Sequence, residues 1–250
     1  MAVIGERWEV YALPDGEGRR VVSFDVDALD EARRPASSSR RVVLEIPAEM
    51  RADNGMPAPA AAVPMRLAEE SLLAALESTR VRCRLVARQT WRGVRELAFQ
   101  VEDGIAFEKI FGDWQRAQRW GSFHVDAEDG WTWFDANVRP PPEGWEQIRN
   151  RAVVNQLLEA GTNPEEPHRL EHVFKGSRDA LDALAKDLAD LGFERNAATR
   201  AADTATFVAD AMLDVFEITD VTVRLRALAG THGVAYQGWG AAVIPLPGCP

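Results

Sequence analysis

Two histidines have the spacing of a zinc-binding pair. His168 and His172 stand four residues apart, and such a pair can share one zinc ion when both side chains project from one face of a helix. The run from Leu170 to Phe174 alternates apolar and polar residues, however, and this pattern predicts a strand. Four residues of strand separate side chains on the same face by roughly 13 Å. We therefore predict no metal at this pair, and we interpret His172 as a partly buried strand histidine.

An acidic run near the N-terminus resembles a cation-binding loop. Asp25, Asp27, Asp30 and Glu31 lie close together in the sequence, but the turn glycine and the terminal glutamate of an EF-hand are missing. Short runs of carboxylates usually lie on exposed surface. We interpret these residues as a solvated strand end.

A glycine-rich motif near the C-terminus resembles part of a dinucleotide-binding fingerprint. Gly238-Trp239-Gly240 follows the last predicted strand and runs on toward Pro245 and Pro247. A dinucleotide phosphate needs the N-terminus of a helix at this point, and no helix is predicted there. We therefore predict no bound cofactor.

No motif with the parts of a known catalytic site is present. Cys83 and Cys249 have no neighbouring histidine in the sequence, and there is no G-x-S-x-G nucleophile motif. We predict that the protein is not an enzyme, with no catalytic residues. A catalytic triad assembled in space from distant residues stays open as an alternative.

The charge distribution argues against direct binding to nucleic acid. The 250 residues carry 29 basic and 39 acidic side chains, a net charge of −10, and residues 164–250 carry 13 acidic against 8 basic ones. Both halves are therefore acidic, whereas phosphate binding needs a positive surface. An RNA-recognition motif also needs a basic, aromatic central strand. The corresponding strand, at 206–210, has one aromatic residue and an acid.

The composition indicates a cytoplasmic protein. No apolar run reaches the roughly 18 to 20 residues that a membrane span requires, and the first residues lack the basic and then apolar pattern of a signal peptide. Two cysteines far apart in the sequence suit a reducing compartment.

The hydrophobic pattern of the first half predicts a β-hairpin followed by the order β-α-β-β-α-β. Asp129-Gly130 is typical of a type I′ turn, so it predicts a hairpin between short strands at 123–125 and 131–133. The expected strands lie at 7–12, 22–26, 42–46, 81–87 and 97–101, the expected helices at 65–78 and 107–114, and a loop at 52–64.

The second half repeats the same order. Pro140-Pro141-Pro142 marks the boundary, Ser177 is placed to cap a helix, and Gly192 is placed to end it. The expected helices lie at 144–160, 178–191 and 218–228, and the expected strands at 170–174, near 193, at 206–214 and at 234–236. We predict an α+β protein of two ferredoxin-like βαββαβ sandwiches, the first extended by the N-terminal β-hairpin. The predicted domains are residues 1–139 and residues 140–250, the second including the linker helix.

Three segments of the second half resemble one protein family. They are the run Gly144 to Arg151, the strand and helix from Leu170 to Phe193, and Tyr236-Gln237-Gly238-Trp239-Gly240. Together they resemble the regulator of ribonuclease activity B family. The first half is similar to an uncharacterised bacterial domain that often precedes it. The family's terminal motif is usually Y-D-G-W-G followed by a cysteine, and here Gln237 replaces the acid and Ala241 replaces the cysteine.

The resemblance implies a non-catalytic, acidic cytoplasmic protein that binds the scaffold region of a ribonuclease E-type endonuclease and restrains RNA decay. The acidic charge would suit a basic, disordered scaffold. We carry over Tyr236, Gly238, Trp239 and Gly240 as motif positions, and we hypothesise that they form the partner-binding site. Two other functions stay open, namely an immunity or adaptor module for an unrelated partner, and an enzyme with a site between the domains.

Trp239 is the residue on which this hypothesis depends most. It is expected beyond the last strand, held on a tight turn between two glycines, where an exposed tryptophan is typical of an interface anchor. The alternative is a packed position in which the indole folds back over the sheet edge.

Overall fold

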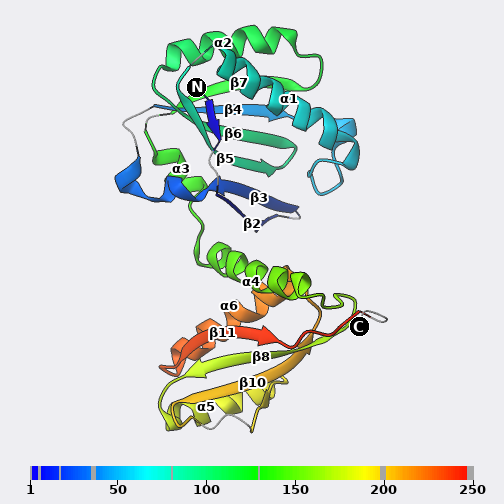
Figure 1. The fold of residues 1–250 in the computed structure, drawn as a ribbon, viewed down its shortest axis with the longest axis vertical. Coiled ribbons are helices and arrows are strands. Elements are labelled where there is room, and N and C mark those ends of the chain that lie inside the picture. Colours follow the sequence, from blue (N-terminus) through cyan, green and yellow to red (C-terminus); the bar gives the residue numbers. More distant parts are fainter. Residues whose placement is uncertain are drawn as a thin grey trace. The chain divides into compact units, whose positions relative to one another are not determined.

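The computed structural model describes residues 2–4, 7–16, 18–34, 38–79, 81–128, 130–197 and 201–246. Cys249 of the sequence analysis lies outside these residues. The chain divides into two compact units, Met1–Gly144 and Trp145–Pro250, each of which combines a sheet with helices (Figure 1). Within the described residues, no helix has the length and apolar character needed to cross a membrane.

The N-terminal unit contains a sheet of seven strands. Its path is β2-β3-β5-β6-β4-β7, and β1 pairs with β5 in parallel. The order β5-β6-β4-β7, with α1 and α2 as the connecting helices, is that of a ferredoxin-like sandwich. The elements are β1 (Ala2–Ile4), β2 (Trp8–Asp15), β3 (Gly18–Asp25), β4 (Ser38–Glu45), α1 (Pro59–Ser78), β5 (Cys83–Trp91), β6 (Val94–Val101), α2 (Gly104–Ala117), β7 (Ser122–Glu128) and α3 (Thr132–Asn137), with short 3-10 turns at Val26–Leu29, Glu31–Arg33 and Ala48–Met50.

Both faces of this sheet are covered. On one face, α1 and α2 bury Leu72, Phe107 and Trp114 against the apolar side chains of β4 to β7. Arg41 lies next to the core residue Val42 on β4 and so points to the other face, where its guanidinium stacks on the ring of Trp133 in α3. The hairpin β2-β3 continues the sheet beyond β5.

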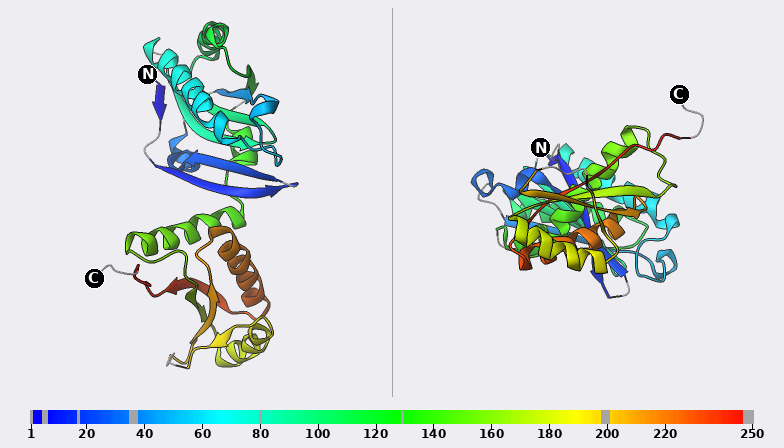
Figure 2. Two further views of the ribbon diagram at one scale, coloured as in Figure 1. Left: turned by 90° about the vertical axis from the view of Figure 1, so that its right-hand side faces the viewer. Right: turned by 90° about the horizontal axis from the view of Figure 1, so that it is seen from below.

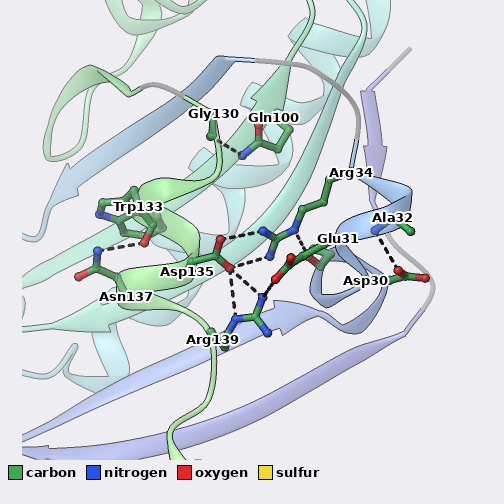
Figure 3. A network of polar contacts seen from close by, with 11 residues as sticks. Asp30, Glu31, Ala32, Arg34, Gln100, Gly130, Trp133, Asp135, Asn137 and Arg139 are labelled. Carbon is green, nitrogen blue, oxygen red and sulfur yellow. Dashed lines mark hydrogen bonds and ion pairs between the residues drawn. The ribbon is translucent and has the colours of Figure 1, made fainter.

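Helix α3 is tied to the chain after β3 by a network of ion pairs (Figure 3). Arg34 donates two hydrogen bonds of 2.7 Å to the carboxylate of Asp135, and Arg139 joins the same carboxylate to Glu31. The Arg34 guanidinium also stacks on Trp131. These contacts lower the pKa of Asp135, chiefly through the hydrogen bond from Arg34.

The C-terminal unit is a second ferredoxin-like sandwich. Its four strands have the order β11-β8-β10-β9, all antiparallel, and the chain order is β-α-β-β-α-β. Helices α5 and α6 lie on one side of the sheet, and α4 lies along the edge strand β11 (Figures 1 and 2). The elements are α4 (Pro142–Glu159), β8 (His168–Lys175), α5 (Arg178–Asp190), β9 (Glu194–Arg195), β10 (Thr204–Ala211), α6 (Val215–Thr231) and β11 (Ala235–Ala241).

The predicted fold class is confirmed: the protein is α+β with two ferredoxin-like sandwiches, and the hairpin β2-β3 extends the first. The cap of α5 is also confirmed, because the Ser177 hydroxyl accepts a hydrogen bond from the amide of Ala180, and Gly192 follows the helix with φ +86°. Leu181, Leu184 and Leu188 form its buried stripe.

The hairpin expected around Asp129-Gly130 is wrong. Strand β7 is followed by helix α3, so Trp131 and Trp133 do not lie on a strand. The helix buries Trp133 and Phe134 on the back of the sheet. The turn dipeptide is therefore compatible with either structure, and burial of the aromatic rings decides between them.

The expected loop at 52–64 is also wrong in its second half, because α1 begins at Pro59. Proline is well tolerated at the start of a helix, and the alanines that follow favour helix strongly. Pro64 lies inside α1. A proline at this position has no backbone N–H, so the helix lacks one of its hydrogen bonds there.

We had expected Asp25 to lie at a solvated strand end, and this expectation is wrong. Its side chain is fully buried and accepts a 2.7 Å hydrogen bond from Nε of Arg84 on β5. Asp27 is partly exposed and pairs with Arg7, and Asp30 caps a 3-10 turn. The acidic run is therefore a structural junction in which each of these three carboxylates has an internal partner.

Candidate functional site: a glycine-floored groove beside Trp239

The family-like motif lies within strand β11, not on a turn beyond the last strand as we had expected. Tyr236 pairs with Phe174 of β8, and Trp239 pairs with His172. Between them the register skips Gln237, which forms a β-bulge. Gly238 has φ +127°, a conformation that glycine adopts freely, and it allows the strand to continue after the bulge.

Trp239 is half-buried, and its indole is held by a hydrogen bond. The indole Nε1 donates to the side-chain oxygen of Asn150 on α4 at 2.8 Å. The amide nitrogen of Asn150 donates in turn to the hydroxyls of Thr219 and Thr222 on α6. The ring also packs against a small core cluster that includes Ile218. Trp239 therefore links the edge strand to both helices beside it.

Tyr236 lies in the core of the unit. Its ring packs against Phe174, and its hydroxyl shares a 2.9 Å hydrogen bond with Nδ1 of His172. Burial lowers the pKa of His172 to about 4 and raises the pKa of Tyr236, so both side chains are neutral at pH 7. Because Tyr236 is only 5% exposed, it fixes the position of β11 and contributes no contact surface of its own.

A buried carboxylate joins α4 to α6 at one end of the motif. Glu146 is only 5% exposed at its side chain and forms ion pairs with Arg149 at 2.5 Å and with Arg226 at 3.0 Å. The Arg226 guanidinium also lies 5.2 Å from the centre of the Tyr236 ring. Two cations compensate the buried charge, as a carboxylate at this depth requires.

These elements enclose an open groove of about 660 Å³. One wall is formed by α4, and the floor is formed by the part of β11 that contains Gly238 and Gly240, next to β8. A Cβ atom added at either glycine would meet no atom within 4 Å, so the missing side chains leave space that no other part of the protein fills. The lining residues are Glu146, Arg149, Asn150, Ala152, Val153, Glu171, Val173, Arg226, Gln237, Gly238, Trp239 and Gly240.

The structure thus brings three of the four hypothesised site residues to one groove. Gly238, Trp239 and Gly240 line it, whereas the side chain of Tyr236 is buried in the core of the unit. Only Gly238 has a backbone conformation that needs glycine. Gly240 does not have positive φ, so its lack of a side chain has no backbone explanation.

The two histidines lie on strand β8, as predicted, and point to the same face of it. His172 is fully buried, which corrects our expectation of partial burial. His168 is also buried, and its ring nitrogens contact the Thr162 hydroxyl at 2.7 Å and the Glu166 carbonyl at 2.8 Å. Among the described residues, no group of three or more His, Cys, Asp or Glu side chains is arranged to hold a metal ion.

Comparison with known proteins locates this region within a family. The family described as "Regulator of ribonuclease activity B" matches residues 147–241. A protein of that name from Pseudoalteromonas atlantica is 34% identical over 103 residues, which cover 38% of this chain and 88% of the relative. The chain belongs to the regulator of ribonuclease activity B family. Two further members are similar: one from Aeromonas hydrophila is 36% identical over 97 residues (36% of this chain, 84% of the relative), and one from Shewanella amazonensis is 32% identical over 103 residues (38% and 73%).

The family match covers every lining residue of the groove except Glu146. It begins within α4, three residues before Asn150, and ends at Ala241, the last residue of β11. A crystal structure of an unknown protein from Galdieria sulphuraria aligns with 83% of this chain and 99% of its own, at 12% identity and a TM-score of 0.22. The resemblance of the N-terminal unit to an uncharacterised bacterial domain stays a prediction.

Sequence reasoning did not identify the polar residues that line the groove outside the motif at 236–240. Glu146 and Asn150 lie within the run Gly144 to Arg151 that carried the resemblance, but they were not singled out. A usable signal was present, because α4 carries apolar residues on more than one side and a polar residue among them must find a buried partner. Arg226 and Glu171 had no comparable signal. Each is a polar residue next to a core leucine in an ordinary amphipathic helix or strand, where a charged side chain is expected.

Proposed function

We propose that this chain regulates a ribonuclease by binding a protein partner, without a catalytic step of its own. The observation that carries the proposal is that all lining residues of the groove except Glu146 lie within the region matched by the family described as "Regulator of ribonuclease activity B". We propose the scaffold region of a ribonuclease E-type endonuclease as the partner, with restraint of RNA decay as the result.

The groove supports binding better than it supports catalysis. The carboxylate of Glu146 is compensated by two arginines, and His172 is buried and hydrogen-bonded to Tyr236. Neither group is free to take a proton from a substrate in the groove, and the remaining lining carboxylate, Glu171, is exposed to solvent. The floor is made of glycine backbone, which offers shape and space for a partner's side chain but no reactive group.

Gly240 provides a direct test of this proposal. We expect Gly240→Leu to fill the groove and to weaken binding of the full chain to a purified ribonuclease E-type endonuclease by at least tenfold. The matched control is Ala235→Leu, on the same strand, where the residue is exposed but lies outside the groove. Binding is measured by isothermal titration, and ribonuclease activity on a structured RNA substrate is measured in parallel.

Three results would contradict the proposal. The wild-type chain could fail to bind the endonuclease, or could bind it without changing RNA cleavage. Alternatively, Gly240→Leu and Ala235→Leu could bind equally well, in which case the groove is not the contact site.

A further inference from the structure

One charge in the groove is not used by the fold. Glu171 lies on β8 opposite Gly240, its side chain is exposed, and within the described part of the chain it forms no ion pair. Glu146, the other carboxylate of the groove, is buried and compensated by Arg149 and Arg226. Only Glu171 is therefore available to a cation that enters the groove.

The two ends of the groove differ in charge. Arg226 stacks on Tyr236, which is opposite Phe174 of β8, whereas Glu171 is three residues away from Phe174 along β8, roughly 10 Å at the usual strand rise. The arginines and Glu171 thus lie at opposite ends. A cation near Glu171 meets an uncompensated carboxylate and is separated from the guanidinium groups, which Glu146 already neutralises in part.

The space beside Glu171 suits a long side chain. Gly238 and Gly240 leave the floor open, while Val153 and Val173 provide apolar walls and Trp239 an aromatic one. The methylene stem of an arginine or lysine packs on apolar surface while its charged head stays near water, and a guanidinium also packs favourably against an indole.

We propose that the groove binds an extended peptide segment of the partner through one arginine or lysine side chain, whose charged head pairs with Glu171. The inference rests on the proposed function, since it describes the chemistry of the same contact. Residues 164–250 carry a net charge of −5, which attracts a basic segment and repels the phosphates of RNA.

Peptide titration of the ¹⁵N-labelled full chain tests this chemistry. The probe is acetyl-Gly-Val-Arg-Val-Gly-amide, and its controls carry citrulline or glutamate in place of arginine. We expect the arginine peptide to shift the indole signal of Trp239 and the amide signals of Gly238 and Gly240 in a saturable way. We expect the citrulline peptide to bind about tenfold more weakly, and the glutamate peptide not to bind, because only arginine can pair with the carboxylate.

Two variants separate the specific contact from overall charge. Glu171→Gln should weaken the arginine peptide about tenfold, whereas Asp210→Asn, which removes an exposed carboxylate outside the groove, should leave its affinity unchanged. Equal binding of the arginine and citrulline peptides, preference for the glutamate peptide, or saturable groove shifts with a single-stranded RNA oligonucleotide would each overturn the inference. So would a lack of shifts with every probe.

The outcome is distinguishable from failure of the proposed function. If the arginine peptide binds through Glu171 but the endonuclease does not bind the chain, the ribonuclease proposal fails and the groove chemistry stands. If the endonuclease binds and Glu171→Gln has no effect on that binding, the ribonuclease proposal stands and the inference fails.

Discussion

The indole of Trp239 and the side-chain amide of Asn150 form a 2.8 Å hydrogen bond that joins the edge strand β11 to helix α4. The amide continues to the hydroxyls of Thr219 and Thr222, so one buried asparagine connects three elements. A tryptophan held in this way has an orientation fixed by its polar edge, while part of the ring remains at the groove. The residue is thus both packed and accessible, which lies between the two alternatives that the sequence suggested.

This bond predicts energetic coupling between Trp239 and Asn150. Trp239→Phe removes the donor and should lower the free energy of unfolding of the C-terminal unit by about 1–2 kcal/mol. Asn150→Leu removes the acceptor and should cost more, because the hydroxyls of Thr219 and Thr222 also lose the donor that Asn150 provides. We expect the double variant to be less destabilised than the sum, with a coupling energy of about 1 kcal/mol.

The two units can unfold in separate transitions, so the free energy is best read from amide hydrogen exchange of α5 and β10. Strict additivity of the two substitutions would mean that the hydrogen bond contributes nothing to stability. A further variant, Trp239→Ala, is used to measure both binding of the partner and stability. A loss of binding of more than about 2 kcal/mol, with a smaller loss of stability, would support a direct contact.

The two glycines of the motif should respond differently to alanine. Gly238→Ala places a Cβ on a residue with φ +127° and should cost about 1 kcal/mol or more. Gly240→Ala needs no unusual φ and meets open space, so it should be neutral or slightly stabilising. Urea unfolding of the two variants checks this. Equal destabilisation would show that Gly240 is required by the fold, and would remove the argument that its missing side chain serves the groove.

The sequence predicts most of the helices, the cap of α5 and the order of the elements in each sandwich, because these depend on residues close together in the chain. The leucine spacing of α5, its Ser177 cap and the βαββαβ order could be read from the sequence, because periodicity and capping act within one element. The length of β11 could not be predicted from the sequence. Gly238-Trp239-Gly240 has no strand pattern, and it is strand because β8 offers it paired backbone beyond the bulge.

Burial explains the other differences. The turn dipeptide before α3 predicted a hairpin, but the aromatic residues after it gain more by covering the back of the sheet. Asp25 looked exposed because its sequence neighbours are acidic, and Arg84, which pairs with it, is 59 residues away. The groove was beyond prediction for the same reason, since α4, β8 and β11 meet only in the folded unit.

Burial of His172 predicts a loss of stability at mildly acidic pH. Its pKa is lowered from 6.5 to about 4 in the folded protein, so the unfolded chain takes up the proton first. The free energy of unfolding is unaffected by this histidine above about pH 6.5. Between about pH 6.5 and 4 it falls as the pH drops, by about 1.4 kcal/mol per pH unit at the steepest part. Carboxylates titrate in the lower part of this range, so wild type is compared with His172→Asn at pH 7, 6, 5 and 4.5. Parallel curves for the two proteins would contradict the assignment.

The last prediction concerns Arg34 and Asp135 in the N-terminal unit (Figure 3). The Arg34 side chain is 8% exposed, donates twice to one carboxylate, and stacks on Trp131. Lysine keeps the charge but can provide neither the paired donors nor the planar stacking. Arg34→Lys should therefore lower the free energy of unfolding of this unit by about 1–2 kcal/mol.

The neighbouring Arg33 provides the matched control. Its side chain is 68% exposed and pairs with Asp30, so Arg33→Lys should change stability by less than about 0.5 kcal/mol. Urea unfolding at low and high salt separates the two cases further, because salt screens an exposed pair and has much less effect on a partly buried one. If Arg34→Lys and Arg33→Lys are equally stable at both salt concentrations, the ion pair does not hold α3 in place, and packing of Trp133 and Phe134 must do so instead.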